Sequence, residues 1–308
     1  MQLSNLQRVT LFLASLFVAV ALSSIPLYAG DDGYVIRANV NEVRLAFAAS
    51  DRQGHSIKTL HATDIAVADN GAIIRHFRSF RAASESPLDL VILLDASDSV
   101  ATKIPQEVAE VKSFIEKSKW GERDRVSIIT FGGLQAQLLC ARNCHSDSAQ
   151  QKLDSLQASG ATPLYDALFE ATELLKRDRD PQSRLAMILF SDGVDTISMH
   201  SAPSVIEASE NLQSAIYSVN PCPAKLGSGR GDGVLQYFST NTGGLSFAPG
   251  SDVEQVLSTV LDDLHSGYVL TYALPEQTGG QHAVRVLATS DPRLEFRARR
   301  AYNDSEEE

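Results

Sequence analysis

The chain has 308 residues, of which 44% are hydrophobic and 21% charged, so it is long and apolar enough to bury a core and is expected to be globular. Its formal net charge is −11 at pH 7 and its basic residues do not cluster, which argues against nucleic acid and anionic membrane surfaces as partners. The glycine-containing loops lack the GxxxxGK[ST] pattern, so no nucleotide site is expected.

Residues 1–29 have the composition of an export signal. They contain one basic residue, Arg8, no acidic residue, an apolar run from about Leu11 to Leu22, and an end at Ala29 that resembles a cleavage site. This pattern predicts a secretory signal peptide, with a retained anchor as the alternative. Either interpretation makes the protein exported, whether periplasmic, on the cell surface or secreted. No later segment is long and apolar enough to span a bilayer, so no membrane insertion is expected after signal removal.

Short alternating patterns predict β-strands in the N-terminal segment 30–84 and again in the C-terminal segment 267–303. The pair Asn70-Gly71 is typical of a hairpin turn between two such strands. Neither segment alone is large enough to bury a core, so we expect the two to pair into one β-sandwich, with two separate β appendages as the alternative. Residues 304–308 form an acidic, solvated tail.

The central segment, 85–266, alternates aliphatic strands with amphipathic helices. The expected strands cover 88–95, 125–131, 135–140, 185–191, 214–219 and 244–248. The expected helices cover 102–118, 147–157, 163–177, 203–212, 232–241 and 252–265. This alternation predicts an α/β fold with a doubly wound, mainly parallel, Rossmann-like sheet covered by helices on both faces.

Three cysteines leave one over if two of them pair. Cys140 and Cys144 are close enough to pair within one loop, and Cys222 offers an alternative partner for either. Only His145 lies near the first pair and no second CxxC or HxxxH follows, so a zinc site is not expected. We expect a structural disulfide, with its connectivity left open.

Polar side chains follow the predicted strands where ligands bind in open parallel sheets, outside the carboxyl ends. Asp95, Ser97 and Ser99 follow the first strand of the central segment, and Asp192 follows the fourth. Thr162 precedes a predicted helix, where its hydroxyl is expected at the N-cap near the same edge. These oxygen ligands suit Mg²⁺, or Mn²⁺ and Ca²⁺, better than zinc or copper. Mg²⁺ takes six oxygens, so the set is one ligand short.

This arrangement resembles the metal-ion-dependent adhesion site of von Willebrand factor type A (VWA) domains, on the sequences "DASDS", "SGATPLYDAL" and "SDG". The resemblance covers about 180 residues and implies that Ser97 and Ser99 ligate the metal directly and Thr162 directly or through water. It also implies that Asp95 and Asp192 act through water and that a carboxylate of a partner protein completes the octahedron.

A narrower resemblance is to bacterial proteins with a VWFA-related domain. The sequence is similar to their pattern in "LHATDIAVADNGAIIRHF", "SDGVDTIS", "TGG" and the closing "GYVLTY". It departs from the commonest motif in having Asp98 where glycine is usual. An additional acid there either raises the affinity for Ca²⁺ or Mn²⁺ or points into solvent, and the second is the expectation.

The resemblance implies a binding module for adhesion or complex assembly rather than an enzyme. A scaffold with a purely structural metal is the first alternative. A Mg²⁺-dependent hydrolase is the second, but it needs a carboxylate at the position of Ser97 and a phosphate-binding lysine, and no histidine follows a predicted strand as a base. The tripeptide Arg230-Gly231-Asp232 is interpreted as part of a glycine-rich loop without a binding role.

Overall fold

The computed structural model describes five stretches of the chain, residues 42–144, 147–177, 179–223, 229–274 and 279–304. All of them fall in one compact unit. The expected signal peptide over 1–29, residues 30–41 of the expected N-terminal β segment and residues 305–308 of the expected acidic tail lie outside the described residues. Within the described stretches, no helix has the length and apolar character needed to cross a bilayer.

A six-stranded sheet forms the centre of the α/β part, in the order β10-β9-β8-β5-β6-β7. All neighbouring pairs are parallel except β7, which runs antiparallel to β6. The predicted mainly parallel sheet is therefore confirmed. Its strands are β5 (Leu88–Asp95), β6 (Arg125–Gly132), β7 (Gln135–Cys140), β8 (Arg184–Phe190), β9 (Ser214–Val219) and β10 (Ser246–Phe247).

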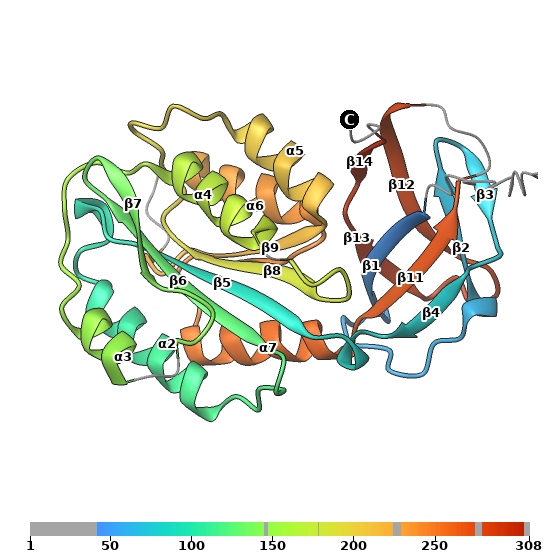
Figure 1. Cartoon of the computed structure of the whole chain (residues 1–308), viewed down its shortest axis with the longest axis horizontal. Helices are drawn as coiled ribbons and strands as arrows, with labels where there is room; N and C mark the ends of the chain where they lie inside the picture. The colour runs from blue at the N-terminus through green and yellow to red at the C-terminus, as the bar shows by residue number, and fades with distance from the viewer. Residues whose placement is uncertain (1–41, 145–146, 178, 224–228, 275–278, 305–308) are drawn as a thin grey trace, which may run out of the picture. The chain divides into compact units, whose positions relative to one another are not determined.

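Helices cover both faces of this sheet, as Figure 1 shows. One face packs against α2 (Ile104–Lys117), α3 (Asp147–Asp154) and α7 (Val253–Ser266). The other face packs against α4 (Leu164–Lys176), α5 (Ala202–Leu212) and α6 (Gly229–Thr242). These layers make the sheet a doubly wound, Rossmann-like one.

The central strand β5 is buried on both sides along its whole length. Leu90 and Ile92 belong to the core with α2 and α7, whereas Val91 and Leu93 belong to the core with α4 and α5. This explains the unbroken aliphatic run, because a strand covered on both faces has no solvent side for polar residues. Each such side chain contributes about 1.5–3 kcal/mol through burial. The run ends at Asp95, where the strand reaches the carboxyl edge of the sheet.

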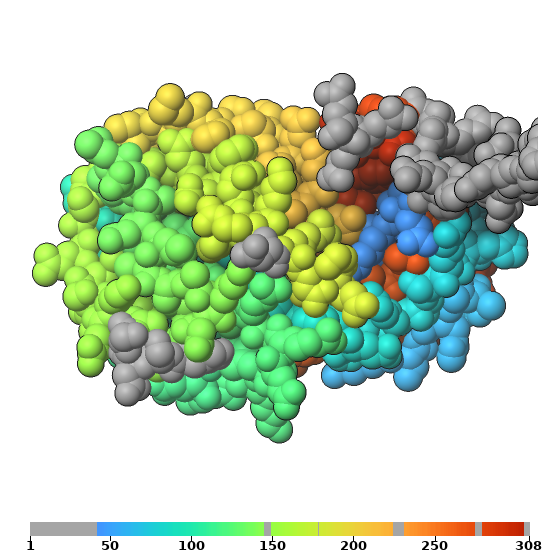
Figure 2. All heavy atoms as spheres, in the orientation of Figure 1, coloured from blue at the N-terminus to red at the C-terminus, as the bar shows by residue number. Residues whose placement is uncertain are grey.

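The flanking segments form two four-stranded antiparallel sheets, in the orders β13-β1-β11-β4 and β14-β12-β2-β3. N-terminal β1 lies between C-terminal β11 and β13, and C-terminal β12 pairs with N-terminal β2. Figure 2 shows blue and red atoms of the two ends of the chain gathered together. The strands are β1 (Glu42–Ser50), β2 (Ile65–Asp69), β3 (Ala72–Ile74), β4 (Ser79–Ala82), β11 (Tyr268–Ala273), β12 (Gly280–Ala288), β13 (Glu295–Ala298) and β14 (Ala301–Asp304).

Both sheets contribute side chains to one hydrophobic core, so they form a sandwich. Asn70 (φ 44°) and Gly71 (φ 86°) join β2 to β3, which confirms the predicted hairpin turn. Near the end of the expected C-terminal β segment, Arg299-Arg300 separates β13 from β14, and these two strands belong to different sheets. Three short 3₁₀ turns complete the described elements: η1 (Ala62–Asp64), η2 (Ala83–Glu85) and η3 (Asp98–Val100).

The α/β part is connected to the sandwich by two chain crossings that lie next to each other. The chain enters the α/β part after β4 and leaves it at Gly267, before β11, and β4 and β11 are paired. The amide of Ala83 donates to the carbonyl of Gly267 at 2.7 Å. The two crossings are therefore hydrogen-bonded to each other.

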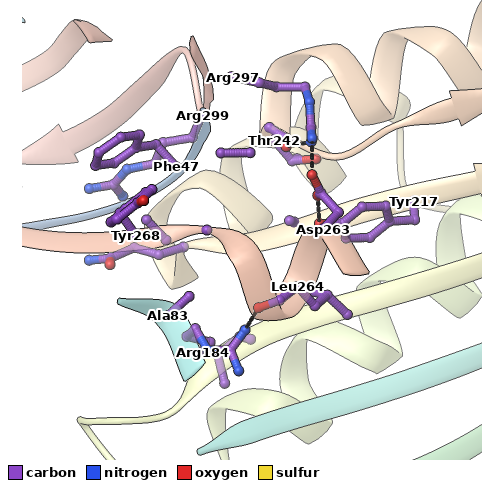
Figure 3. Close-up of a pocket in the computed structure, with 17 residues that line it drawn as sticks. Phe47, Ala83, Arg184, Tyr217, Thr242, Asp263, Leu264, Tyr268, Arg297 and Arg299 are labelled. Carbon is purple, nitrogen blue, oxygen red and sulfur yellow. Dashed lines mark hydrogen bonds and ion pairs between the residues drawn. The ribbon is translucent and has the colours of Figure 1, made fainter. Parts of the chain in front are cut away.

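Charged side chains line a cavity of about 70 Å³ between the α/β part and the sandwich (Figure 3). Arg184 donates to the carbonyl of Leu264 in the last turn of α7. Arg297 of β13 donates to Asp263, which also accepts from the Tyr217 hydroxyl at 2.5 Å. Cations near a helix C-terminus satisfy free carbonyls and favour the helix dipole, so these contacts stabilise the join.

A buried carboxylate lies inside the sandwich. Asp69 accepts from the hydroxyls of Tyr272 and Tyr302 and lies 2.6 Å from Nδ1 of His282. The Tyr302 ring lies under Arg299, which donates to the carbonyl of Glu210 at the end of α5. The network therefore continues from the sandwich core to the α/β part.

A disulfide joins Cys140 and Cys144, whose Cα atoms are 5.7 Å apart. This is one of the three pairings that the sequence left open, and Cys222 is not part of it. The bridge closes the turn after β7, where Asn143 forms an isolated β-bridge with Val126. It fixes the outer edge of the central sheet.

Candidate metal centre

The residues after β5 form the first segment of the site. Asp95 is buried, and its Oδ1 accepts from the amide of Ser97 at 2.9 Å. Its Oδ2 accepts from the Ser191 hydroxyl at 2.6 Å. The hydroxyl oxygens of Ser97 and Ser99 are 3.1 Å apart. The carboxylate is thus fixed from two sides, and two predicted ligand hydroxyls lie next to each other.

Ser191 is a further member of the site, and no role was expected for it from the sequence. It follows β8 directly, is fully buried, and also accepts from the amide of Gly193 at 3.1 Å. Its hydroxyl therefore joins the first segment to the segment that carries Asp192. The signal in the sequence was a second hydroxyl residue at a strand end beside a predicted ligand.

Thr162 is buried and lies in the second segment, just before α4. Its amide donates to the Thr196 hydroxyl at 2.8 Å and its carbonyl accepts from the amide of Thr196 at 3.0 Å. The expected N-cap at Thr162 is wrong, because α4 begins at Leu164 with Pro163 as its N-cap. The Ser198 hydroxyl caps this helix instead, so capping does not use the Thr162 hydroxyl.

The sequence suggested that Asp98 points into solvent, but in the structure its side chain also accepts a hydrogen bond. Its side chain is exposed, but its Oδ1 accepts from the amide of Gly160 at 3.1 Å. Its own amide donates to the carbonyl of Gly160 at 3.2 Å. Gly160 lies two residues before Thr162, so Asp98 fixes the second segment against the first.

Asp192 lies in the third segment, half-buried, and its Oδ1 accepts from the amide of Val194 at 3.1 Å. The neighbouring Gly193 packs against α6: a Cβ there would lie 2.3 Å from the carbonyl oxygen of Gly231. In turn, a Cβ on Gly231 would lie 2.1 Å from the carbonyl oxygen of Asp192. Two glycines are therefore needed for this close backbone approach.

The tripeptide at 230–232 lies in the first turn of α6 and not in a loop, which corrects the interpretation from sequence. Gly231 provides the close packing against Asp192, and Asp232 accepts from the amide nitrogen of the Asn220 side chain at 2.7 Å. Both contacts are structural.

The three segments are connected in a closed ring of hydrogen bonds. Asp95 is bonded to Ser191, Asp98 to Gly160, and Thr162 to Thr196. Every segment therefore contacts the other two. Each of the five predicted residues lies in one of these segments at the carboxyl edge of the sheet: Asp95, Ser97, Ser99, Thr162 and Asp192.

The electrostatics at this edge favour a cation. Burial raises the pKa of Asp95, and the charge of Asp192 raises it further, while hydrogen bonds from Ser191 and Ser97 lower it. Burial, followed by the charge of Asp95, raises the pKa of Glu107 on α2 to about 8. Oε1 of Glu107 is buried and has no hydrogen-bond partner in the described part of the chain. Burial thus disfavours negative charge on both acids, and a nearby cation would lower both pKa values.

The donor set suits a hard cation. The described residues contain no group of three or more His, Cys, Asp or Glu side chains arranged for a metal. The candidate centre differs from such groups, because it has two carboxylates and three hydroxyls. Oxygen-only sets of this kind fit Mg²⁺, Mn²⁺ or Ca²⁺ when water or another oxygen ligand completes them.

The fold and this edge define the class of protein: an α/β domain with a doubly wound sheet and an oxygen-lined site at its carboxyl edge. Residues 90–194 match the sequence profile of the von Willebrand factor type A domain. This stretch, from β5 to the loop after β8, is therefore similar in sequence to a domain of this family.

Two curated relatives are magnesium-chelatase subunits. The 67 kDa subunit of Chlorobaculum tepidum is 30% identical over 123 residues, which are 39% of this chain and 20% of that protein. The 60 kDa subunit of Rhodobacter capsulatus is 28% identical over 110 residues, which are 36% of this chain and 20% of that protein. This chain thus matches about a fifth of the length of these relatives.

Two solved structures are also similar. The pilus adhesin SpaC of Lactobacillus rhamnosus GG has a TM-score of 0.48 and 14% identity, over 58% of this chain and 30% of that chain. A von Willebrand factor type A protein of Catenulispora acidiphila has a TM-score of 0.47 and 14% identity, over 85% of this chain and 72% of that chain.

Proposed function

We propose that this protein is an exported, non-enzymatic binding module that recognises a carboxylate of a partner protein through a divalent cation. Mg²⁺ is the first candidate for this cation, and Mn²⁺ and Ca²⁺ are the alternatives. The closed ring of hydrogen bonds carries this proposal, because it arranges five oxygen side chains in three segments around one edge of the sheet. The serine hydroxyls 3.1 Å apart suit direct ligation.

In this proposal Ser97 and Ser99 ligate the metal directly and Thr162 directly or through water, while Asp95 and Asp192 orient its waters. The structure supports an orienting role for Asp95, since both of its oxygens already accept hydrogen bonds. Such bonds fix a carboxylate and are typical of the groups that surround a metal's direct ligands. The cation itself supplies the positive charge that binds the partner's Asp or Glu.

The hydrolase alternative has less support. A serine nucleophile needs a neighbouring base, and the hydroxyl of Ser97 is hydrogen-bonded to the hydroxyl of Ser99 rather than to a histidine. Asp95 is held by two donors, which suits an acceptor better than a nucleophile. The scaffold alternative uses the same residues and differs only in having no ligand at the open position.

We also propose export and the division into a signal peptide at 1–29, β segments at 30–84 and 267–303, and a VWA domain at 85–266. The disulfide between Cys140 and Cys144 supports export, because such bonds persist in oxidising compartments and are rare in the cytosol.

Titration calorimetry with MgCl₂ tests the metal centre. Ser97→Ala is expected to lower the Mg²⁺ affinity at least about tenfold, since it removes a ligand. Ser118→Ala, at the end of α2 away from this edge, is the control and should leave the affinity unchanged. Equal affinities in wild type and Ser97→Ala would refute the proposed centre. Mg²⁺ binding that stabilises the fold but never recruits a carboxylate peptide would favour the scaffold.

A further inference from the structure

Large exposed apolar side chains concentrate on the loops that border the candidate metal centre. Seven such side chains are exposed in the described residues, and four of them lie on the loops that follow β6 and β8. Single exposed apolar residues are normal, but a group around one site indicates an interaction surface. We call these four the apolar rim: Leu134 (81% exposed), Val194 (47%), Ile197 (42%) and Met199 (95%).

The loop after β8 is held firmly although its apolar side chains face water. The amides of Met199 and His200 both donate to Asp166 of α4, at distances of 2.9–3.1 Å. The His200 ring stacks on Phe169, with centroids 3.9 Å apart. The backbone of Met199 is thus fixed while its side chain is almost fully exposed. Because the loop backbone is already fixed, it loses little further conformational entropy when a partner binds to its side chains.

Leu134 borders the site from the other side. The amide of the preceding Gly133 donates to the carbonyl of Ser159, whose amide donates to the carbonyl of Ala96 at 2.7 Å. Ala96 lies between two of the predicted site residues. The apolar rim therefore includes the loops after β6 and β8, the two strands that flank β5 in the sheet, and the first site segment follows β5.

The charges of the same surface restrict what can bind. Asp98, Asp192 and Asp195 lie at this edge with at least partly exposed side chains. These carboxylates repel further acidic groups of a partner. The partner is therefore expected to present one carboxylate, which the cation would bind, and otherwise neutral groups. Neutral apolar groups beside that carboxylate would bury the rim and exclude water, which strengthens the ionic contact.

We infer that the partner presents its carboxylate between large aliphatic side chains, which pack on the apolar rim of Leu134, Val194, Ile197 and Met199. This inference rests on the proposed function, because the cation must hold the carboxylate. It names the chemistry of the partner: a single acidic residue flanked by residues such as leucine and isoleucine.

Three fluorescent peptides test it, measured by anisotropy with saturating Mg²⁺. One has a central Asp between Leu and Ile, the second a central Asp between two Ser, and the third a central Asn between Leu and Ile. We expect the first to bind about tenfold more tightly than the second, from the apolar area buried. The third should lose binding because it has no carboxylate.

Matched variants locate the effect. Ile197→Ser should weaken binding of the first peptide about three- to tenfold with unchanged Mg²⁺ affinity. Ile73→Ser is the control, since Ile73 is 53% exposed in β3 of the sandwich, and should change nothing. Equal binding of the two Asp peptides, or equal effects of the two variants, would overturn the inference and leave the proposed function standing. Equal binding of the Asp and Asn peptides, or no binding at all, would overturn both.

Discussion

Asp95 shows how single residues build this site. Its carboxylate is buried at the end of a buried strand, and the amide of Ser97 and the hydroxyl of Ser191 compensate part of the desolvation. The position of Asp95 could be predicted, because the carboxyl ends of parallel strands meet at one edge. The roles of Ser191 and Asp98 could not, because they depend on which distant segment lies opposite each side chain.

Glu107 gives a prediction for stability against pH. Its folded pKa of about 8 lies above its ordinary 4.5, so the unfolded chain releases its proton first as the pH rises. The contribution of protonated Glu107 to stability is fully present below about pH 4.5. It decreases as the pH rises from about 4.5 to about 8. Glu107→Gln should therefore be the more stable protein at the upper end of this window, by on the order of a few kcal/mol.

Denaturant unfolding across that window, with a chelator present, measures this difference. Glu210, whose pKa is raised to about 7 mainly by burial, remains in both proteins and so cancels in the comparison. Parallel pH profiles for the wild type and Glu107→Gln would contradict the prediction.

At the scale of elements, most helices and strands agree with the sequence pattern, because apolar periodicity reports which faces are covered. The differences lie at the first residues of helices, whose positions depend on contacts with other segments of the chain. The start of α4 moves to Leu164 because Ser198 of another loop caps it. The start of α6 moves to Gly229, and its first turn packs against the loop after β8 through Gly231. Neither partner can be recognised from local sequence.

The first turn of α6 offers a matched pair of glycine variants. Gly231→Ala should destabilise the fold by roughly 2 kcal/mol or more, because its Cβ would meet the carbonyl oxygen of Asp192 at 2.1 Å. It should also weaken Mg²⁺ binding, since that backbone must shift. Gly233→Ala, in the same helix with nothing within 4 Å, should stabilise by about 0.5–1 kcal/mol.

Thermal unfolding and Mg²⁺ titration of both variants check this pair. The expected order of melting temperatures is Gly233→Ala above wild type and wild type above Gly231→Ala. A Gly231→Ala protein as stable as the wild type would show that the two loops do not need this approach.

At the scale of the whole molecule, the pairing of the two flanking segments was predictable because neither could bury a core alone. The arginine contacts that join the sandwich to helix ends were not, because arginines such as Arg184 and Arg297 look like ordinary surface residues in the sequence. Their carbonyl and carboxylate partners lie at the ends of α7 and α6 and are apparent only in three dimensions.

These contacts predict that the described part of the chain unfolds as one unit. Trp120 reports on the α/β part by fluorescence, and Tyr268, Tyr272 and Tyr302 contribute near-ultraviolet circular dichroism from the sandwich. The two signals should change at the same temperature. Mg²⁺ at a hundredfold excess over Kd should raise the free energy of unfolding by about 2.7 kcal/mol and so move both transitions to the same higher temperature. Separate transitions would show that the join is weak.

The paired crossings at Ala83 and Gly267 also determine how the molecule carries load. A domain on one tether can swivel, and tension then acts on a single chain crossing. Here two crossings leave the α/β part side by side and continue into hydrogen-bonded antiparallel strands, β4 and β11. A pull applied at the carboxyl edge is therefore shared between two covalent connections, and the domain cannot rotate freely about either of them.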